Sequence, residues 1–275
     1  MKLKTPVIAG LIAEETGRMT PLETQKLFDD LYVIRDGFVN VFLVKAGETF
    51  IAIDAGISAE NIGREMERLG IEADTVKAVL ITHSDIDHVY GLAAFPAAEV
   101  YFPEAELEML GKYRISMTER DWTEACVRHA GFSPLAGEKL FGDAEFWLEE
   151  DCEIADAPHG KVISFLKNRI DSPFRRVGDG SRLDFEGARV DVALIAGHTQ
   201  GLTSYIVNDK YLFVGDALSL LDGKIGPFNS FLNRDEAQHR KSISRLRNVG
   251  RYEFLLTQHY GYTGEIAKAF AGWSE

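Results

Sequence analysis

A run of polar residues follows directly after an apolar segment, and this junction restricts the folds open to the chain. Residues 76–81 are almost continuously apolar, which predicts a strand buried on both faces. After Thr82 the chain continues with His83, Ser84, Asp85, Ile86, Asp87 and His88. Imidazole and carboxylate groups bind divalent metals, and a rigid strand end can aim them at one point. The junction therefore predicts a metal site.

Three further candidate ligands also follow predicted strands. His198 comes after the segment ALIAG, Asp216 after YLFVG and His259 after FLLTQ. A lone residue of this kind is commonly a cap or a surface side chain, but the combined pattern is hard to obtain by accident. The candidate metal ligands are therefore His83, Asp85, Asp87, His88, His198, Asp216 and His259.

The remaining pattern predicts a layered α/β fold. Residues 31–56 predict an antiparallel meander of three strands, and Ser58 and Gly70 mark the ends of a helix. Later segments predict a strand at 99–102, strands within 188–198, 203–207 and 210–217, a helix at 234–249, a strand at 252–259 and a short helix from about 264. Asn208-Asp209 is typical of a hairpin turn. Strands followed by a helix, twice over, favour a layered fold over a doubly wound sheet.

Residues 104–176 have a different pattern, with helical stretches, several aromatic residues and no strand rhythm. We expect them to form a helical cap or lid inserted into a single domain that spans residues 1–275. A lid over a metal groove helps to select the substrate and to exclude water.

Composition narrows the choice of partner. The net charge is −13 and there is no basic run, so nucleic acid is not expected to bind. Cys126 and Cys152 lack CxxC spacing, which suits a reducing compartment. The N-terminal residues do not predict a signal peptide and no segment predicts a membrane span. We expect a cytoplasmic protein with a small-molecule substrate and no membrane partner. The sequence does not determine the oligomeric state, and a homo-oligomer is possible.

The motifs together resemble the metallo-β-lactamase fold superfamily. They are residues 82–88, the sequence Gly197-His198-Thr199-Gln200-Gly201, the pair Gly215-Asp216, and the late His259. Residues 40–56 are similar to the opening hairpin of that family, which ends in Asp-x-Gly. The resemblance implies a four-layer αβ/βα sandwich with a dinuclear metal site in a groove along one edge of the sheets.

The resemblance also implies which residues bind each ion. His83, Asp85 and His198 would bind the first metal, and Asp87, His88 and His259 would bind the second. Asp216 would bridge the two ions together with a water or hydroxide. We expect two zinc ions, with iron or manganese as the alternatives.

Asp85 departs from the family pattern, which usually reads His-x-His-x-Asp-His. Two divalent ions would be balanced by three aspartates and a hydroxide, whereas histidine at position 85 would leave a net charge of +1. A neutral site acidifies its water less and suits iron or manganese better. Two other interpretations remain open: Asp85 replaces one adequate ligand by another, or it is too short to reach the metal.

The resemblance implies a metal-dependent hydrolase. A metal-bridging hydroxide would attack an ester, thioester, lactone or phosphodiester bond of a small molecule, and Asp87, as a catalytic residue, would receive its proton. The alternative is a diiron redox protein that binds or reduces dioxygen or nitric oxide, because flavodiiron proteins carry a carboxylate, usually Glu, at the position of Asp85. A metal-holding protein without activity is a third possibility.

Several weaker candidates lie near these motifs. Thr199 and Thr203 are candidates for supporting His198, although either could serve only a turn. Tyr260 could place a hydroxyl over the metals, but packing is the more common role for a tyrosine after a strand. His239 lies on the late predicted helix, outside the motifs, and is not expected to be a ligand.

Overall fold

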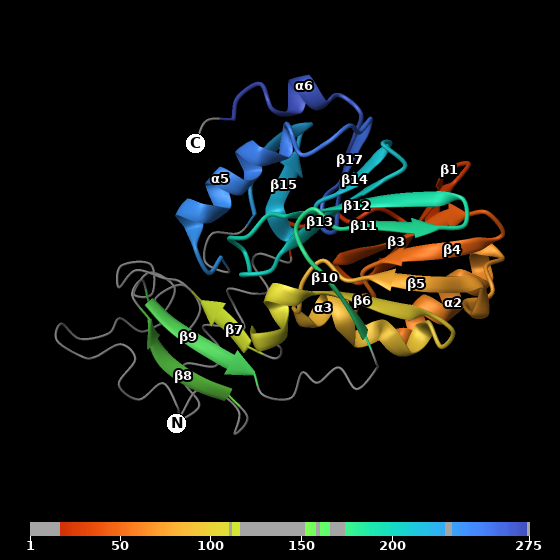
Figure 1. Ribbon diagram of the computed structural model, residues 1–275, viewed down its shortest axis with the longest axis horizontal. Coiled ribbons are helices and arrows are strands. Elements are labelled where there is room, and N and C mark those ends of the chain that lie inside the picture. Colours follow the sequence, from red (N-terminus) through yellow and green to blue (C-terminus); the bar gives the residue numbers. More distant parts are fainter. Residues whose placement is uncertain are drawn as a thin grey trace.

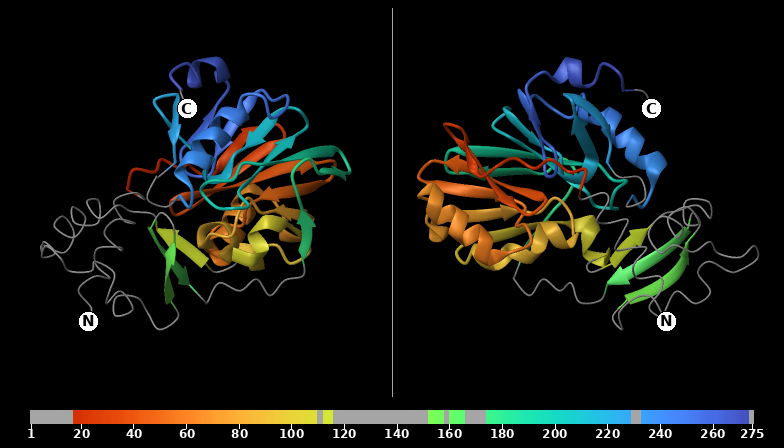
Figure 2. Two further views of the ribbon diagram at one scale, coloured as in Figure 1. Left: turned by 60° about the vertical axis from the view of Figure 1, so that its left-hand side comes forward. Right: turned by 180° about the vertical axis from the view of Figure 1, so that it is seen from behind.

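Two β-sheets pack face to face, and helices cover the outer face of each (Figure 1; Figure 2). The structure is a computed structural model that describes residues 17–109, 112–115, 152–157, 160–165, 174–228 and 233–273. This arrangement is the four-layer sandwich expected from the sequence. Figure 1 shows α2 and α3 below the sheets and α5 and α6 above them.

The first sheet contains seven strands, six from the first part of the chain and one from beyond the insertion. Their order is β1 (Gln25–Phe28), β2 (Leu31–Asp36), β3 (Val39–Ala46), β4 (Thr49–Ile53), β5 (Val76–Leu80), β6 (Glu99–Pro103) and β10 (Phe174–Val177). The pairs from β1 to β4 are antiparallel, so the expected meander is confirmed. The pairs from β4 through β5 and β6 to β10 are parallel. Strand β5 is buried at every position except Lys77, as its apolar run predicts.

The main helix beside this sheet, α2, begins and ends where the sequence places it. Helix α2 (Ala59–Leu69) starts after Ser58, whose Oγ accepts a hydrogen bond from the Asn61 amide at 3.2 Å. It ends at Gly70, which has φ +72°. The short helices that follow are η1 (Ala73–Thr75), α3 (Ile86–Val89) and η2 (Tyr90–Ala94). Among the described residues, no helix is both long and apolar enough to cross a membrane.

The second sheet belongs to the later part of the chain. Its order is β11 (Arg182–Phe185), β12 (Ala188–Leu194), β13 (Thr203–Val207), β14 (Tyr211–Phe213), β17 (Phe254–Thr257) and β18 (Gly261–Thr263). Asn208 and Asp209, with φ values of 55° and 52°, form the tight turn between β13 and β14 that the sequence predicts. The remaining elements are η5 (Gly215–Ala217), β15 (Leu218–Leu221), β16 (Lys224–Pro227), α5 (Glu236–Leu246) and α6 (Ile266–Ala269).

The core is divided into three layers by the two sheets. Between the sheets, Phe42 of the first packs against Phe213 of the second, with ring centroids 5.2 Å apart. Ile62 and Met66 of α2 pack on the outer face of the first sheet. Ile243 and Leu246 of α5 pack on the outer face of the second. Because both sheets are covered on both faces, the polar residues that follow their strands lie at the ends of the layers, not within them.

The expectation of a helical cap is wrong for the described part of residues 104–176. After η3 (Glu104–Met109), that part contains a three-stranded antiparallel sheet of β7 (Lys112–Ile115), β9 (Gly160–Phe165) and β8 (Cys152–Ala157). This sheet lies to one side of the sandwich (Figure 1; Figure 2). The sequence contains one reason: β-branched Val162 and Ile163 favour a strand.

The expected end of the insertion is also corrected. Phe174–Val177 forms β10 and pairs with β6 in the main sheet, so the main domain resumes before residue 176. The helical stretch expected at residues 118–132, which includes Cys126, lies outside the described residues.

Candidate metal centre

The predicted ligands gather at one end of the sandwich, although they come from both sheets. Four follow β5: His83 and Asp85 lie in the loop, and Asp87 and His88 lie in α3. His198, Asp216 and His259 follow β12, β14 and β17. The pairings make these three strands run in the same direction, so their carboxyl ends meet at one edge. The topology therefore brings the candidates together, as the sequence predicts.

The first group consists of His83, Asp85 and His198, whose candidate ligand atoms lie within 4.8 Å of one another. Oδ2 of Asp85 is 3.5 Å from Nε2 of His83 and 3.1 Å from Nε2 of His198. Asp85 is buried, with its carboxylate directed at both imidazoles. Its side chain is therefore long enough to share a centre with the two histidines.

The second group consists of Asp87, His88 and His259. Oδ2 of Asp87 is 3.6 Å from Nε2 of His88 and 3.4 Å from Nε2 of His259. The Asp87 side chain is 13% exposed, whereas the two imidazoles are almost completely buried. Asp87 is thus the member of this group that solvent can reach.

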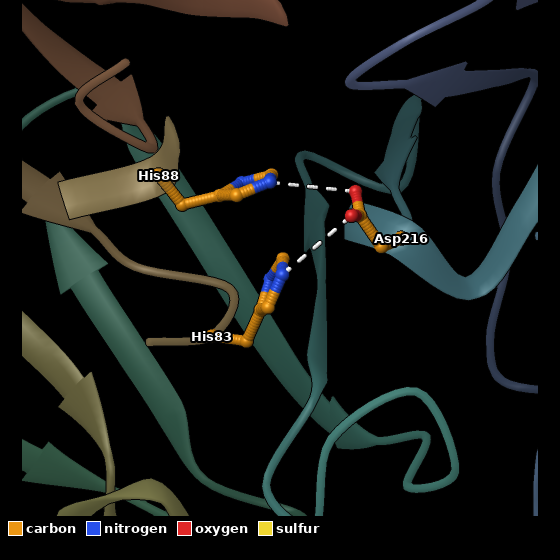
Figure 3. Close-up of side chains that lie close together, drawn as sticks. All are labelled: His83, His88 and Asp216. Atoms are coloured by element: carbon orange, nitrogen blue, oxygen red, sulfur yellow. Dashed lines mark ion pairs between the residues drawn. The ribbon is translucent and has the colours of Figure 1, made fainter. Parts of the chain in front are cut away.

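Asp216 lies between the two groups and turns one oxygen to each. Its Oδ2 is 3.6 Å from Nε2 of His83 and 3.5 Å from Nε2 of His198. Its Oδ1 is 3.4 Å from Nε2 of His88 and 3.1 Å from Nε2 of His259. Figure 3 shows His83 and His88 pointing at the carboxylate of Asp216. This is the arrangement expected of a bridging carboxylate.

Each of the four histidines has its Nδ1 held by another group, which leaves Nε2 facing the centre. The partners are Thr82 Oγ1 for His83 at 3.0 Å, Asp54 Oδ2 for His88 at 2.9 Å, Asn233 Oδ1 for His198 at 3.0 Å and the Phe38 carbonyl for His259 at 2.8 Å. Such outer partners fix the tautomer and the ring orientation of metal-binding histidines.

Sequence reasoning identified none of these four partners. Asp54 also accepts hydrogen bonds from the amide of Thr82 at 2.7 Å and from its hydroxyl at 2.9 Å. Its signal in the sequence is the Asp-x-Gly that closes the opening hairpin. Asn233 donates to Glu236 Oε2 at 2.8 Å, and no local pattern marks it as a partner of His198.

The unsatisfied atoms of the centre test whether metal ions fit it. Nε2 of His83, His88 and His259 and Oδ1 of Asp216 are buried and have no hydrogen-bond partner among the described residues. Buried polar atoms without a partner are rare, because each costs the free energy of its lost hydration. A cation near these atoms would satisfy all of them. The residues therefore fit divalent metal ions.

The charges within the centre shift its pKa values strongly. Burial opposes ionisation of Asp216, but His259, His88 and His83 outweigh it and hold its pKa well below the ordinary value. Burial lowers the pKa of His88, but Asp87, Asp216 and Asp54 outweigh it, so the pKa lies well above the ordinary value. His198 and His259 shift in the same direction for the same reason. Protons therefore compete with cations for this centre.

The weaker candidates have other roles in the structure. The hydroxyl of Thr203 donates to the Gly201 carbonyl at 2.9 Å, which stabilises the loop after His198. Oγ1 of Thr199 is buried and has no hydrogen-bond partner among the described residues. His239 belongs to neither ligand group, and its Nε2 bonds the Ala217 carbonyl, so the expectation that it is not a ligand agrees with its contacts.

Solved structures resemble this fold along most of the chain. BJP-1, a subclass B3 metallo-beta-lactamase of Bradyrhizobium japonicum, matches with a TM-score of 0.55 and 20% identity, covering 88% of this chain and 79% of that one. A B3 metallo-beta-lactamase described as having an active-site glutamic acid matches with a TM-score of 0.56 and 17% identity, covering 97% and 92%. At such identities the likeness concerns the fold alone.

Sequence comparisons identify the family. A protein of Mycobacterium tuberculosis named as a probable metallo-hydrolase is 26% identical over 176 residues, which are 62% of this chain and 47% of that protein. The match thus spans about half the length of that relative. The family model described as the metallo-beta-lactamase superfamily matches residues 34–259, from β2 to the last candidate ligand. The chain therefore belongs to the metallo-beta-lactamase superfamily.

Proposed function

We propose that this protein is a metal-dependent hydrolase with two metal positions. The observation that carries the proposal is the position of Asp216, whose two carboxylate oxygens face two separate groups of candidate ligands. The chemistry that two divalent ions supply when bound is a water acidic enough to act as a nucleophile and polarisation of the bond to be cleaved. Neither a serine nor a cysteine nucleophile is then required.

The side chains of this protein have distinct tasks in such a reaction. Asp85 and Asp216 bring negative charge into a buried space, which favours cations there. Asp87, the more exposed carboxylate, would accept the proton of the attacking water. Phe228 stacks on His259, with ring centroids 5.4 Å apart, and meets the edge of His198 at 5.1 Å. Its ring limits the movement of one imidazole from each group.

The proposed substrate is a small molecule with an ester, thioester, lactone or phosphodiester bond. The net charge of −13 opposes binding of nucleic acid. We also propose that the protein acts in the cytoplasm, on the basis of its cysteine usage. Cell fractionation with an antibody against the protein would test the location directly.

A test begins with elemental analysis of protein purified without added metal. Hydrolysis is then measured on a carboxylic ester, a thioester, a lactone and a phosphodiester. Asp216→Asn removes the charge of the bridging carboxylate, and Asp222→Asn makes the same change in an exposed turn. Two zinc or manganese ions per chain, with turnover lost only in Asp216→Asn, would support the proposal. Turnover equal in both variants would contradict it.

A diiron redox protein is the second candidate, and Asp85 is the observation that favours it. Its carboxylate lies 3.1 Å from Nε2 of His198, so the first group contains a hard oxygen ligand where the family usually has imidazole. An additional carboxylate stabilises ferric iron and suits manganese or iron better than a third imidazole does. Two irons per chain, a visible absorption band and oxygen uptake by the reduced protein would put this function ahead of hydrolysis.

A further inference from the structure

Glu106 is a completely buried carboxylate in η3, where the chain leaves the main sheet and enters the insertion. It belongs to none of the three groups of candidate ligands found among the described residues. Burying a carboxylate is costly unless donors surround it. The position of this side chain therefore needs an explanation that the metal centre alone does not give.

The contacts of Glu106 join two loops that are distant in sequence. Its Oε2 accepts hydrogen bonds from the Ser84 amide at 3.0 Å and from the Ser84 hydroxyl at 2.6 Å. Its Oε1 accepts from the Gly201 amide at 2.6 Å. Hydrogen bonds to a charged acceptor are shorter and stronger than those between neutral groups. One carboxylate thus ties the loop after β5 to the loop after β12.

The packing around Gly201 shows how closely η3 approaches the second loop. A Cβ atom built on Gly201 would lie 2.6 Å from the Glu106 amide nitrogen and 2.8 Å from the Ala105 carbonyl carbon. No side chain fits there without moving the backbone. The approach is therefore a second feature, independent of the hydrogen bonds, that fixes η3 against the ligand loops.

The two residues held by Glu106 flank the first ligand group and not the second. Ser84 stands between His83 and Asp85, and Gly201 follows His198 by three positions in the same loop. The second group is supported elsewhere: Asp54 holds His88, and the Phe38 carbonyl holds His259. Displacing Glu106 should thus move the three ligands of one group relative to one another and leave the other group in place.

We propose that Glu106 is a positioning residue that sets the geometry of the first metal position, formed by His83, Asp85 and His198. The proposal rests on the proposed metal-dependent function. Because Glu106 belongs to η3, it also makes the start of the insertion part of the support of the metal centre. A substitution in η3 should therefore weaken metal binding at the first position more than at the second.

The test is zinc titration of metal-free protein against a chromogenic chelator, which resolves two binding constants. Glu106→Gln keeps the size of the side chain but leaves one acceptor oxygen, so one of the two loops faces an amide NH₂. We expect one zinc constant to weaken by about 10- to 100-fold, the usual effect of losing an outer partner, with the other within about twofold. Glu104→Gln, an exposed glutamate of the same η3, should leave both constants unchanged.

Two backgrounds identify which position is affected. In a His259→Ala background, Glu106→Gln should still weaken the remaining zinc site, whereas in a His198→Ala background it should add no further loss. Unfolding of each metal-free variant by urea measures any general loss of stability. If Glu106→Gln does not fold, Ser84→Ala removes one donor only, and we expect a loss of about fivefold at the same position.

The outcomes separate the two proposals. Two zinc ions in the unmodified protein, with equal weakening of both constants by Glu106→Gln, would overturn the positioning role and leave the proposed function standing. The same holds if the loss persists in the His198→Ala background. An unmodified protein that binds no zinc, iron or manganese would overturn the proposed function and the positioning role with it.

Discussion

Nδ1 of His88 lies 2.9 Å from Oδ2 of Asp54, and both side chains are fully buried. The same carboxylate holds Thr82, whose hydroxyl lies 3.0 Å from Nδ1 of His83. One aspartate of the opening hairpin thus orients a histidine in each of the two ligand groups.

Asp54→Asn should therefore weaken both zinc constants, by about 10- to 100-fold, because an amide cannot accept the three hydrogen bonds that Asp54 accepts. Competition with a chelator measures both constants. Asp30→Asn is the control, since Asp30 bonds Lys210 and Tyr211 and touches no candidate ligand. Equal effects of the two changes would mean that Asp54 supports only the fold.

Asp85→His is expected to retain two metals and to raise the charge of the loaded centre from neutral to +1. A more positive centre acidifies its water more strongly. The rise of hydrolytic rate with pH should therefore shift to lower pH in the variant. Rate profiles of both proteins on one substrate measure the shift. A shift to higher pH would show that charge does not control the acidity of the water.

Metal binding should strengthen as pH rises. Burial lowers the pKa of His88 and His198, but neighbouring carboxylates outweigh it and raise both values, so these imidazoles must release protons to bind a cation. Zinc affinity should increase by up to about tenfold per pH unit for each proton released. Calorimetry in buffers of different ionisation enthalpy counts those protons. Zinc binding without proton release would show that His88 and His198 carry no extra proton in the metal-free protein.

The metal-free protein should respond to pH in the opposite direction. A histidine whose folded pKa is raised stabilises the fold below its unfolded pKa of about 6.5, and this contribution is lost as pH rises through the folded value. Thermal unfolding in the presence of a chelator should therefore show a lower midpoint at about pH 9 than at about pH 7. Zinc should remove that difference.

His239 should make the fold sensitive to acid. Burial is the main cause that lowers its pKa to about 4. Between its unfolded pKa of about 6.5 and this value the unfolded chain binds more protons, so stability falls as pH falls, by about 1–3 kcal/mol. His239→Gln keeps a donor for the Ala217 carbonyl and should reduce this loss. Urea unfolding of metal-free protein across that pH range measures it.

The parts of the fold that the sequence predicts are those with a local signal. Helix α2 has its cap Ser58 and its terminal Gly70, and Asn208-Asp209 marks the hairpin. The candidate ligands are predictable because each follows a strand. The expectation of a helical cap is wrong for the described residues because it gives stretches with helical spacing more weight than the β-branched pair Val162-Ile163. The sequence does not predict the short strands β15 and β16, because each has only four residues and no strong alternation of apolar and polar residues.

The supporting side chains could not be predicted, for a physical reason. Asp54 is 34 positions from His88, Asn233 is 35 from His198 and Glu106 is 95 from Gly201. A hydrogen bond between such distant residues produces no periodicity in the chain. Only the tertiary structure brings its donor and acceptor together.

The position of Asp216 between the two ligand groups has a kinetic consequence. Its partners come from both sheets, and Asp85 and His198, which meet beside it, are 113 positions apart in the chain. Ions held there would cross-link the two sheets, so the sheets could separate only after the ions leave. Metal would then act mainly by slowing unfolding, because the centre closes after the sheets have docked. The lifetime of the folded molecule would depend on how fast its ions dissociate.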